Sequence, residues 1–144
     1  MSYQRQRSRG QSRKNQKITK KDIKNFKEKY VFLMFCTPEN YSCMKEYPFL
    51  KAMHEKHHEY LEVVTVMITG SMKNMQEFMK NNNYKWTSLF YGNSDEILDL
   101  YNIRAYPTCY LIGPDGLLIQ SPATLPTEGF EQQLFRIMRS RGDL

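Results

Sequence analysis

Apolar residues are grouped along this chain in short runs that have the length of buried β-strands. The run from Tyr30 to Cys36 is continuous, which is typical of a strand buried on both faces of a mostly parallel sheet. Glu62 to Ile68 and Thr108 to Ile112 repeat this pattern, and residues 86–91 repeat it more weakly. The pattern therefore predicts a sheet whose first strand is covered on both faces.

Between these runs, apolar residues recur at the three- and four-residue spacing of amphipathic helices. The first helix is expected from Cys43 to about Tyr60, with Ser42 as its N-cap and a kink at Pro48. Three further helices are expected: one that Ser71 opens and that runs through Lys80, a short one that Ser94 caps and that carries Ile97, Leu98 and Tyr101, and one from about Thr127 to Arg139.

A tight turn joins the last two predicted strands. Gly113-Pro114-Asp115-Gly116 has the composition of such a turn, and Leu117 to Gln120 returns as the second arm of a hairpin. The element order is then β-α-β-α-β-α-β-β-α, with crossovers long enough for parallel pairing. This order indicates an α/β fold with a central mixed sheet flanked by helices.

Composition and charge divide the chain into a basic leader and a globular body. The 144 residues are 40% hydrophobic and 13% aromatic, which is typical of one folded domain. Eleven of the 21 Lys and Arg residues, but only two of the 15 acidic residues, fall within residues 1–29. We expect residues 1–17 to be a disordered leader and residues 18–144 to form the domain, with Ile18–Lys29 as a short helix or an approach loop.

The charge and hydropathy patterns also limit the partners. The body after residue 29 is close to neutral, so we expect no nucleic acid on its folded surface. The leader could bind nucleic acid or an anionic membrane, but a solvated tail is the simpler interpretation. No apolar run approaches the roughly 18 residues of a membrane span, and no apolar segment follows the basic N-terminus as it would in a signal peptide.

Three motifs follow one another along the body. The first is Val31–Phe35 leading to Cys43-Met44-Lys45-Glu46-Tyr47-Pro48, the second is Tyr106-Pro107-Thr108 before a strand, and the third is the hairpin Leu111–Gly116. In this order and at these distances they resemble the thioredoxin-like thiol–disulfide oxidoreductases of the bacterial cell envelope, the group that includes cytochrome-maturation reductases. The resemblance covers roughly residues 20–140.

The resemblance implies a thioredoxin-like fold and thiol–disulfide exchange with a protein or peptide partner, in the periplasm or cell envelope and without a cofactor. In that family the second motif holds a cis proline that faces the redox pair, so the Tyr106–Pro107 bond is expected to be cis. The surface beside this proline would bind the partner. In this chain that surface consists of Tyr41, Ser42, Tyr106, Pro107 and Thr108.

The redox motif itself departs from the family pattern. The family's first cysteine, which attacks the target disulfide, falls at Asn40, and the second, which resolves the mixed disulfide, falls at Cys43. An asparagine cannot attack a disulfide. The two positions where the family's buried acid is expected are Met34 and Gly70, so the proton relay is missing as well. We therefore predict a degenerate redox site.

The cysteines leave several alternatives open. Cys43 is either a buried cysteine in the first turn of its helix or a residual reactive thiol at the resolving position. Cys36 is a possible partner, provided that the two Cα atoms lie within about 7 Å. Cys109 follows the second motif inside a strand and is expected in the core. Two functions remain: a redox enzyme that uses Cys43 alone or with Cys36, and a non-catalytic module that binds a peptide.

A second chemical pattern lies in the first helix. Residues 54–58 fit the H-E-x-x-H pattern of zinc peptidases, in which His54 and His58 would hold the metal, Glu55 would act as the base and Glu77 could be a third ligand. The pattern is short and occurs by chance in charged helices, so a surface histidine pair is the simpler interpretation. We predict no metal site, and zinc binding through His54 and His58 is the remote alternative.

Deleting residues 1–17 should lower the melting temperature by less than about 2 °C, because this segment carries almost no apolar surface to bury. Thermal unfolding followed by circular dichroism, with the full chain as the reference, measures the difference. A loss of about 10 °C or more would contradict the assignment of these residues to a leader.

Overall fold

The computed structural model describes residues 28–92 and 95–144. The predicted leader 1–17, the segment 18–27 and the predicted cap Ser94 lie outside the described residues. The elements in chain order are β1 (Tyr30–Cys36), α2 (Tyr41–Met44), α3 (Tyr47–His57), β2 (Leu61–Met67), α4 (Met72–Asn81), β3 (Thr87–Phe90), α5 (Asp95–Leu100), β4 (Thr108–Ile112), β5 (Leu118–Gln120), the short 3₁₀ helix η1 (Pro126–Glu128) and α6 (Phe130–Ser140).

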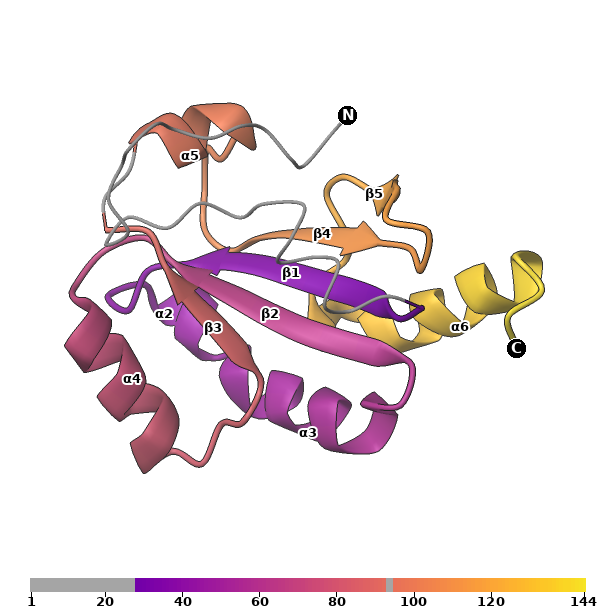
Figure 1. Ribbon diagram of the computed structural model, residues 1–144, viewed down its shortest axis with the longest axis horizontal. Coiled ribbons are helices and arrows are strands. Elements are labelled where there is room, and N and C mark those ends of the chain that lie inside the picture. The colour runs from indigo at the N-terminus through magenta and orange to yellow at the C-terminus, as the bar shows by residue number, and fades with distance from the viewer. Residues whose placement is uncertain (1–27, 93–94) are drawn as a thin grey trace.

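The strands form one mixed five-stranded sheet in the order β3-β2-β1-β4-β5 (Figure 1). Strand β1 pairs in parallel with β2, and β2 pairs in parallel with β3. On its other side β1 pairs antiparallel with β4, which continues into the hairpin with β5. The predicted α/β fold with a central mixed sheet is confirmed.

Helices cover both faces of this sheet. Helices α3, α4 and α6 pack on one face, and α5 packs on the other (Figure 1). All seven residues of β1 are buried, because its alternate side chains enter the two cores in turn. The continuous apolar run in the sequence reflects this central position. Within residues 28–92 and 95–144, no helix is both long and apolar enough to cross a membrane.

Two predicted helices have different limits in the structure. The helix expected from Cys43 to about Tyr60 is divided into α2 and α3, and Asn40, not Ser42, caps α2. The last helix begins at Phe130 and not at Thr127, because Gly129 has a φ of 98°, a left-handed value that ends the preceding 3₁₀ turn. The other predicted strands and helices are present within one or two residues of their expected limits.

A hydrogen-bonded chain joins α3 to α6 at the end of the sheet where β2 begins. His57 is buried, and its Nδ1 lies 2.6 Å from the Tyr60 hydroxyl. Its Nε2 lies 2.5 Å from a Glu131 carboxylate oxygen, and the Lys56 ammonium lies 3.2 Å from the same oxygen. The hydrogen bond from His57, together with Lys56, holds the pKa of Glu131 below its usual value.

This lowered pKa predicts how stability depends on pH. An acid whose folded pKa lies below its unfolded pKa stabilises the fold above the unfolded value and loses this contribution as the pH falls through the folded value. Glu131→Gln should therefore lower the free energy of unfolding by about 1 kcal/mol or less near pH 6, since Glu131 is partly exposed. The difference from the unmodified protein should shrink towards zero at about pH 3.

Urea unfolding at a series of pH values measures this difference. Glu55→Gln is the matched control, because Glu55 is exposed and pairs with Lys51 on the same helix. A constant difference between the unmodified protein and Glu131→Gln down to about pH 3 would contradict the assigned pKa shift.

Candidate redox and binding site

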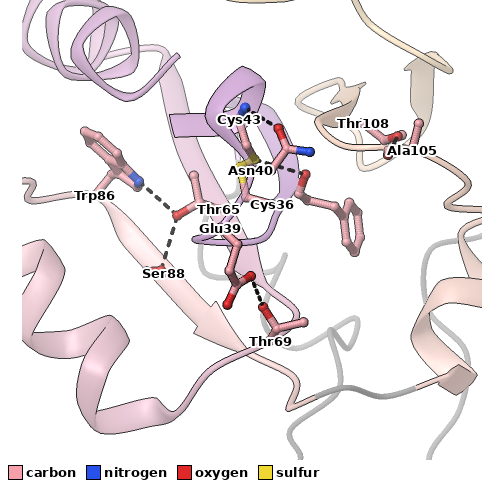
Figure 2. The surroundings of a disulfide bond; sticks show 11 residues. Cys36, Glu39, Asn40, Cys43, Thr65, Thr69, Trp86, Ser88, Ala105 and Thr108 are labelled. Atoms are coloured by element: carbon pink, nitrogen blue, oxygen red, sulfur yellow. Dashed lines mark hydrogen bonds between the residues drawn. A yellow bond between two sulfur atoms is a disulfide. The ribbon is translucent and has the colours of Figure 1, made fainter. Parts of the chain in front are cut away.

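The candidate site lies at the C-terminal end of β1, where the chain enters α2. Cys36, the last residue of β1, is joined by a disulfide to Cys43 in α2 (Figure 2). Their Cα atoms are 5.7 Å apart, within the usual range for a disulfide, and both residues are fully buried. Of the alternatives that the sequence leaves open for these cysteines, the structure contains the Cys36–Cys43 bridge.

Local sequence closes the loop between the two cysteines. Thr37 to Asn40 form a turn in which the Asn40 N–H donates to the Thr37 carbonyl oxygen at 3.2 Å. Pro38 occupies the second position of this turn, where its fixed φ is favourable. This turn places Asn40 immediately before the first residue of α2. We refer to residues 36–44 as the disulfide loop.

Asn40 occupies the N-cap position of α2. Its side-chain Oδ1 accepts a hydrogen bond from the Cys43 N–H at 2.9 Å, as Figure 2 shows. Its backbone carbonyl oxygen accepts from the Met44 N–H at 2.9 Å. Asparagine and serine are both preferred N-cap residues, so residue type indicated a cap in this segment but did not decide between Asn40 and Ser42. Asn40 thus has a structural function as the cap of α2.

Helix α2 is too short to activate a thiol strongly. It comprises four residues and ends at Met44, and Glu46 is the N-cap of the next helix, α3. The charge stabilisation available at a helix N-terminus comes from aligned peptide dipoles, and one turn supplies few of them. The continuous helix expected from the sequence would have given the Cys43 thiolate more charge stabilisation. In the bridged form Cys43 has no thiol to ionise.

The predicted cis peptide bond between Tyr106 and Pro107 is present. It lies immediately before β4, and the antiparallel register aligns Thr108 with Phe35, the neighbour of Cys36. The Thr108 hydroxyl donates to the Ala105 carbonyl oxygen at 2.6 Å and closes the proline loop. Pro107 therefore lies at the same end of the sheet as the disulfide. A second cis bond, between Ser121 and Pro122, was not anticipated from the sequence.

The five residues expected to bind a partner come from two segments at this end of the sheet. Tyr41 is 79% exposed and Ser42 is exposed, both at the start of α2. Tyr106, Pro107 and Thr108 are half-buried at the start of β4. Partial burial raises the pKa of the Tyr106 hydroxyl, which keeps it protonated at neutral pH.

A buried acid follows the disulfide-bonded Cys43 in the chain, at a position that the sequence analysis missed. Met34 is fully buried and Gly70 is exposed, so neither expected position supplies an acid. Glu46, three residues after Cys43, is fully buried instead. Its carboxylate accepts hydrogen bonds from the Thr127 N–H at 3.1 Å and the Thr127 hydroxyl at 2.7 Å. Its place between a cysteine and a helix-breaking proline was the available signal.

The third cysteine lies in the core, as predicted. Cys109 is 1% exposed and is a free thiol. Burial raises its pKa well above the usual value, and the negative charges of Glu46 and Glu128 add to this effect. A thiol in this environment stays protonated at neutral pH and does not attack a disulfide.

The histidine pattern does not form a metal centre among the residues that the structure describes. The rings of His54 in α3 and of His58, the C-cap of this helix, have centroids 6.2 Å apart. His57 is held by Tyr60 and Glu131. In residues 28–92 and 95–144 there is no group of three or more His, Cys, Asp or Glu side chains placed to hold a metal ion.

Comparison with known proteins agrees with the observed fold. A family model described as thioredoxin-like matches residues 27–118. The thiol–disulfide oxidoreductase ResA of Bacillus subtilis is 27% identical over 124 residues, which are 82% of this chain and 66% of the relative. The chain spans 57% to 66% of the length of the curated relatives from Bacillus that it matches.

Solved structures share the same fold. The thioredoxin domain of a thiol–disulfide oxidoreductase from Bacteroides vulgatus aligns with a TM-score of 0.68 at 18% identity, over 80% of this chain and 84% of that one. An exposed lipoprotein thioredoxin from Streptococcus pneumoniae aligns with a TM-score of 0.65 at 24% identity, over 79% of this chain and 89% of that one. At these identities the likeness concerns the fold.

The N-cap role of Asn40 predicts the effect of substitutions in this turn. Asn40→Ala should lower the free energy of unfolding by about 1 kcal/mol, because the Cys43 N–H loses its acceptor. Asn40→Asp should retain most of the stability, since aspartate is an equally good N-cap. Ser42→Ala is the matched control and should have little effect, because Ser42 is exposed and does not cap the helix.

Chemical denaturation of the three variants measures these values. The assignment of the cap is wrong if Ser42→Ala is the more damaging of the two alanine variants.

Proposed function

Because this chain belongs to the thioredoxin-like family of thiol–disulfide oxidoreductases, we propose that it is a member with a degenerate redox site. It binds an extended peptide of a protein partner beside Pro107 and does not turn over disulfides. The observation that carries this proposal is the environment of Asn40 and Cys43. An amide caps the helix where the family has its nucleophile, and the remaining sulfur is bridged and buried.

Thiol–disulfide exchange requires a thiolate that reaches the target sulfur in line with the bond that breaks. Asn40 offers an amide oxygen, which is already bound to the Cys43 N–H, and no sulfur. Cys43 and Cys36 are each 0% exposed. Cys109 is buried with a raised pKa. Among the described residues, which include every cysteine of the chain, there is no exposed thiolate to begin the reaction.

The bridge between Cys36 and Cys43 has a structural role in this proposal. It joins two cysteines that are seven positions apart in the sequence and so closes a short loop at the end of the central strand. A short closed loop loses little entropy on folding, so the start of α2 is held in place relative to β1. Because the loop is already fixed, Tyr41 and Ser42 lose little conformational entropy when a partner binds.

The proposed binding surface combines an exposed aromatic side chain with the proline loop. Tyr41 provides apolar area and a hydroxyl, which favours contacts with protein. Pro107 leads directly into the extended backbone of β4, so a peptide can pair with the start of this strand through main-chain hydrogen bonds. Tyr106 and Thr108 flank this backbone and would contact the side chains of the peptide.

The family and the disulfide together favour an oxidising compartment. Disulfides persist in the periplasm and outside the cell and are rare in the cytosol. We therefore propose the periplasm or cell envelope as the location and a thiol-containing protein as the partner. The proposed division of the chain remains a leader of residues 1–17 and a domain of residues 18–144.

The bridge also supports a second candidate function, exchange through Cys36 and Cys43 themselves. The thiolate of an external dithiol protein would attack one sulfur of the bridge and release the other as a thiolate. The second thiol of that protein would then resolve the mixed disulfide, which leaves both cysteines reduced and the partner oxidised. Because both sulfurs are fully buried, this reaction requires the disulfide loop to open first.

Insulin reduction in the presence of dithiothreitol distinguishes the two functions. The unmodified chain should give a rate close to background, because no attacking thiol is exposed. The double variant Asn40→Cys/Cys36→Ala should raise the rate about tenfold or more, since it restores a Cys-x-x-Cys pair with Cys43. The matched control is Ser42→Cys/Cys36→Ala, which adds a thiol on the same turn at the wrong spacing.

Rapid turnover by the unmodified chain that is lost in Cys36→Ala and in Cys43→Ala would favour exchange through the bridge over the binding module. Rapid turnover that survives both substitutions would contradict both functions.

A further inference from the structure

A cavity of about 310 Å³ lies next to the disulfide loop. Its lining includes Met44 from the end of α2, Met67 from the end of β2, and Met75 and Phe78 from α4. These side chains make its interior apolar. The volume is at the lower end of the range for ligand pockets and is large enough for one bulky side chain.

The cavity and the proline loop lie on opposite sides of the disulfide loop. In the sheet, β2 flanks β1 on one side and β4 flanks it on the other. The cavity is lined from the side of β2 and α4, whereas Pro107 precedes β4. The cavity is therefore a second surface, separate from the one beside Pro107, and an inference about it goes beyond the proposed function.

Covalent and polar contacts hold the walls of this cavity in place. Pro38, Glu39 and Met44 form one wall, and all three belong to the disulfide loop. The Thr69 hydroxyl donates to the Glu39 carboxylate at 2.9 Å and links this loop to the segment after β2 (Figure 2). The opposite wall is α4, whose first turn is capped by Ser71. A cavity with fixed walls binds a ligand without a large cost of reorganisation.

The lining also determines which ligand fits. Methionine side chains are flexible and polarisable, so three of them adapt to apolar groups of different shape. Of the lining residues that the structure describes, Glu39 alone is charged, and it is exposed at the rim. A carboxylate at the rim of an apolar pocket favours a ligand that carries a positive charge beside its apolar group.

We propose that this cavity receives one large apolar side chain of a partner polypeptide, with a lysine or arginine next to it in contact with Glu39. The apolar side chain packs against Met67, Met75 and Phe78. The carboxylate of Glu39 excludes segments that carry an acidic residue at the same place.

Three short peptides test the chemistry: acetyl-Lys-Phe-Lys-amide, acetyl-Lys-Ala-Lys-amide and acetyl-Glu-Phe-Glu-amide. Titration of ¹⁵N-labelled protein, followed by amide chemical shifts, should place the first peptide at residues 39, 69–75 and 78. Its affinity should exceed that of the alanine peptide by about tenfold or more, because burial of a phenyl ring drives binding. It should exceed that of the acidic peptide several-fold at low salt, and less at high salt.

Two variants test the location. Asn74→Trp should abolish binding of acetyl-Lys-Phe-Lys-amide, because Asn74 lines the cavity from the exposed face of α4. Gln76→Trp is the matched control, because Gln76 is exposed on the same helix and does not line the cavity. Glu39→Gln should remove the preference for the basic over the acidic peptide.

The proposal is overturned if no peptide binds below about 5 mM, if Asn74→Trp and Gln76→Trp bind equally well, or if the shifts fall at Tyr41 and residues 106–108. These results are independent of insulin reduction. The cavity assignment stands if Asn74→Trp alone blocks binding while the unmodified chain reduces insulin, and in that case only the proposed function fails.

Discussion

Strand β1 is buried along its whole length, and the position of the candidate site follows from this constraint. The strand pairs with β2 on one side and β4 on the other, and it separates the two cores. Its last residue, Cys36, is therefore fixed on all sides. The disulfide bonds Cys43 to Cys36 and thereby restrains the start of α2 relative to β1. The proline loop before β4 and the cavity beside α4 are both placed relative to this one strand.

We propose that internal bonds in this chain occupy the place where the family has an exposed reactive group. Where the family has a nucleophilic cysteine, Asn40 caps the helix through its side chain. Where the second cysteine would resolve a mixed disulfide, Cys43 is bonded to Cys36 inside the core. In the proposed function both features stabilise the disulfide loop and leave no exposed sulfur to attack a target. The two surfaces on either side of this loop remain available for contacts with other proteins, which is why we favour a binding role.

The sequence predicted the features that depend on local pattern. Strands β1 and β4 have the expected limits, because the apolar runs in the sequence coincide with the segments that are buried in the structure. The division between α2 and α3 corresponds to the kink predicted at Pro48, which lies in the first turn of α3 and has no N–H to donate to the preceding turn. The hydrogen bonds from Thr127 to Glu46 join residues 81 positions apart, so local pattern could not predict them. The choice between Asn40 and Ser42 as the cap required backbone geometry, since both residue types are good caps. The bridge required the distance between two Cα atoms, and the cavity required the packing of α4 against the disulfide loop.

The state of the three cysteines is the most direct test of this account. The purified protein would be equilibrated with an oxidising glutathione buffer, denatured, alkylated before and after reduction, and mapped by mass spectrometry. The account predicts that Cys109 alone is alkylated before reduction, that all three cysteines are alkylated after it, and that an unreduced digest contains a peptide linking Cys36 to Cys43. Alkylation of Cys36 and Cys43 without reduction, or a bridge that includes Cys109, would contradict it.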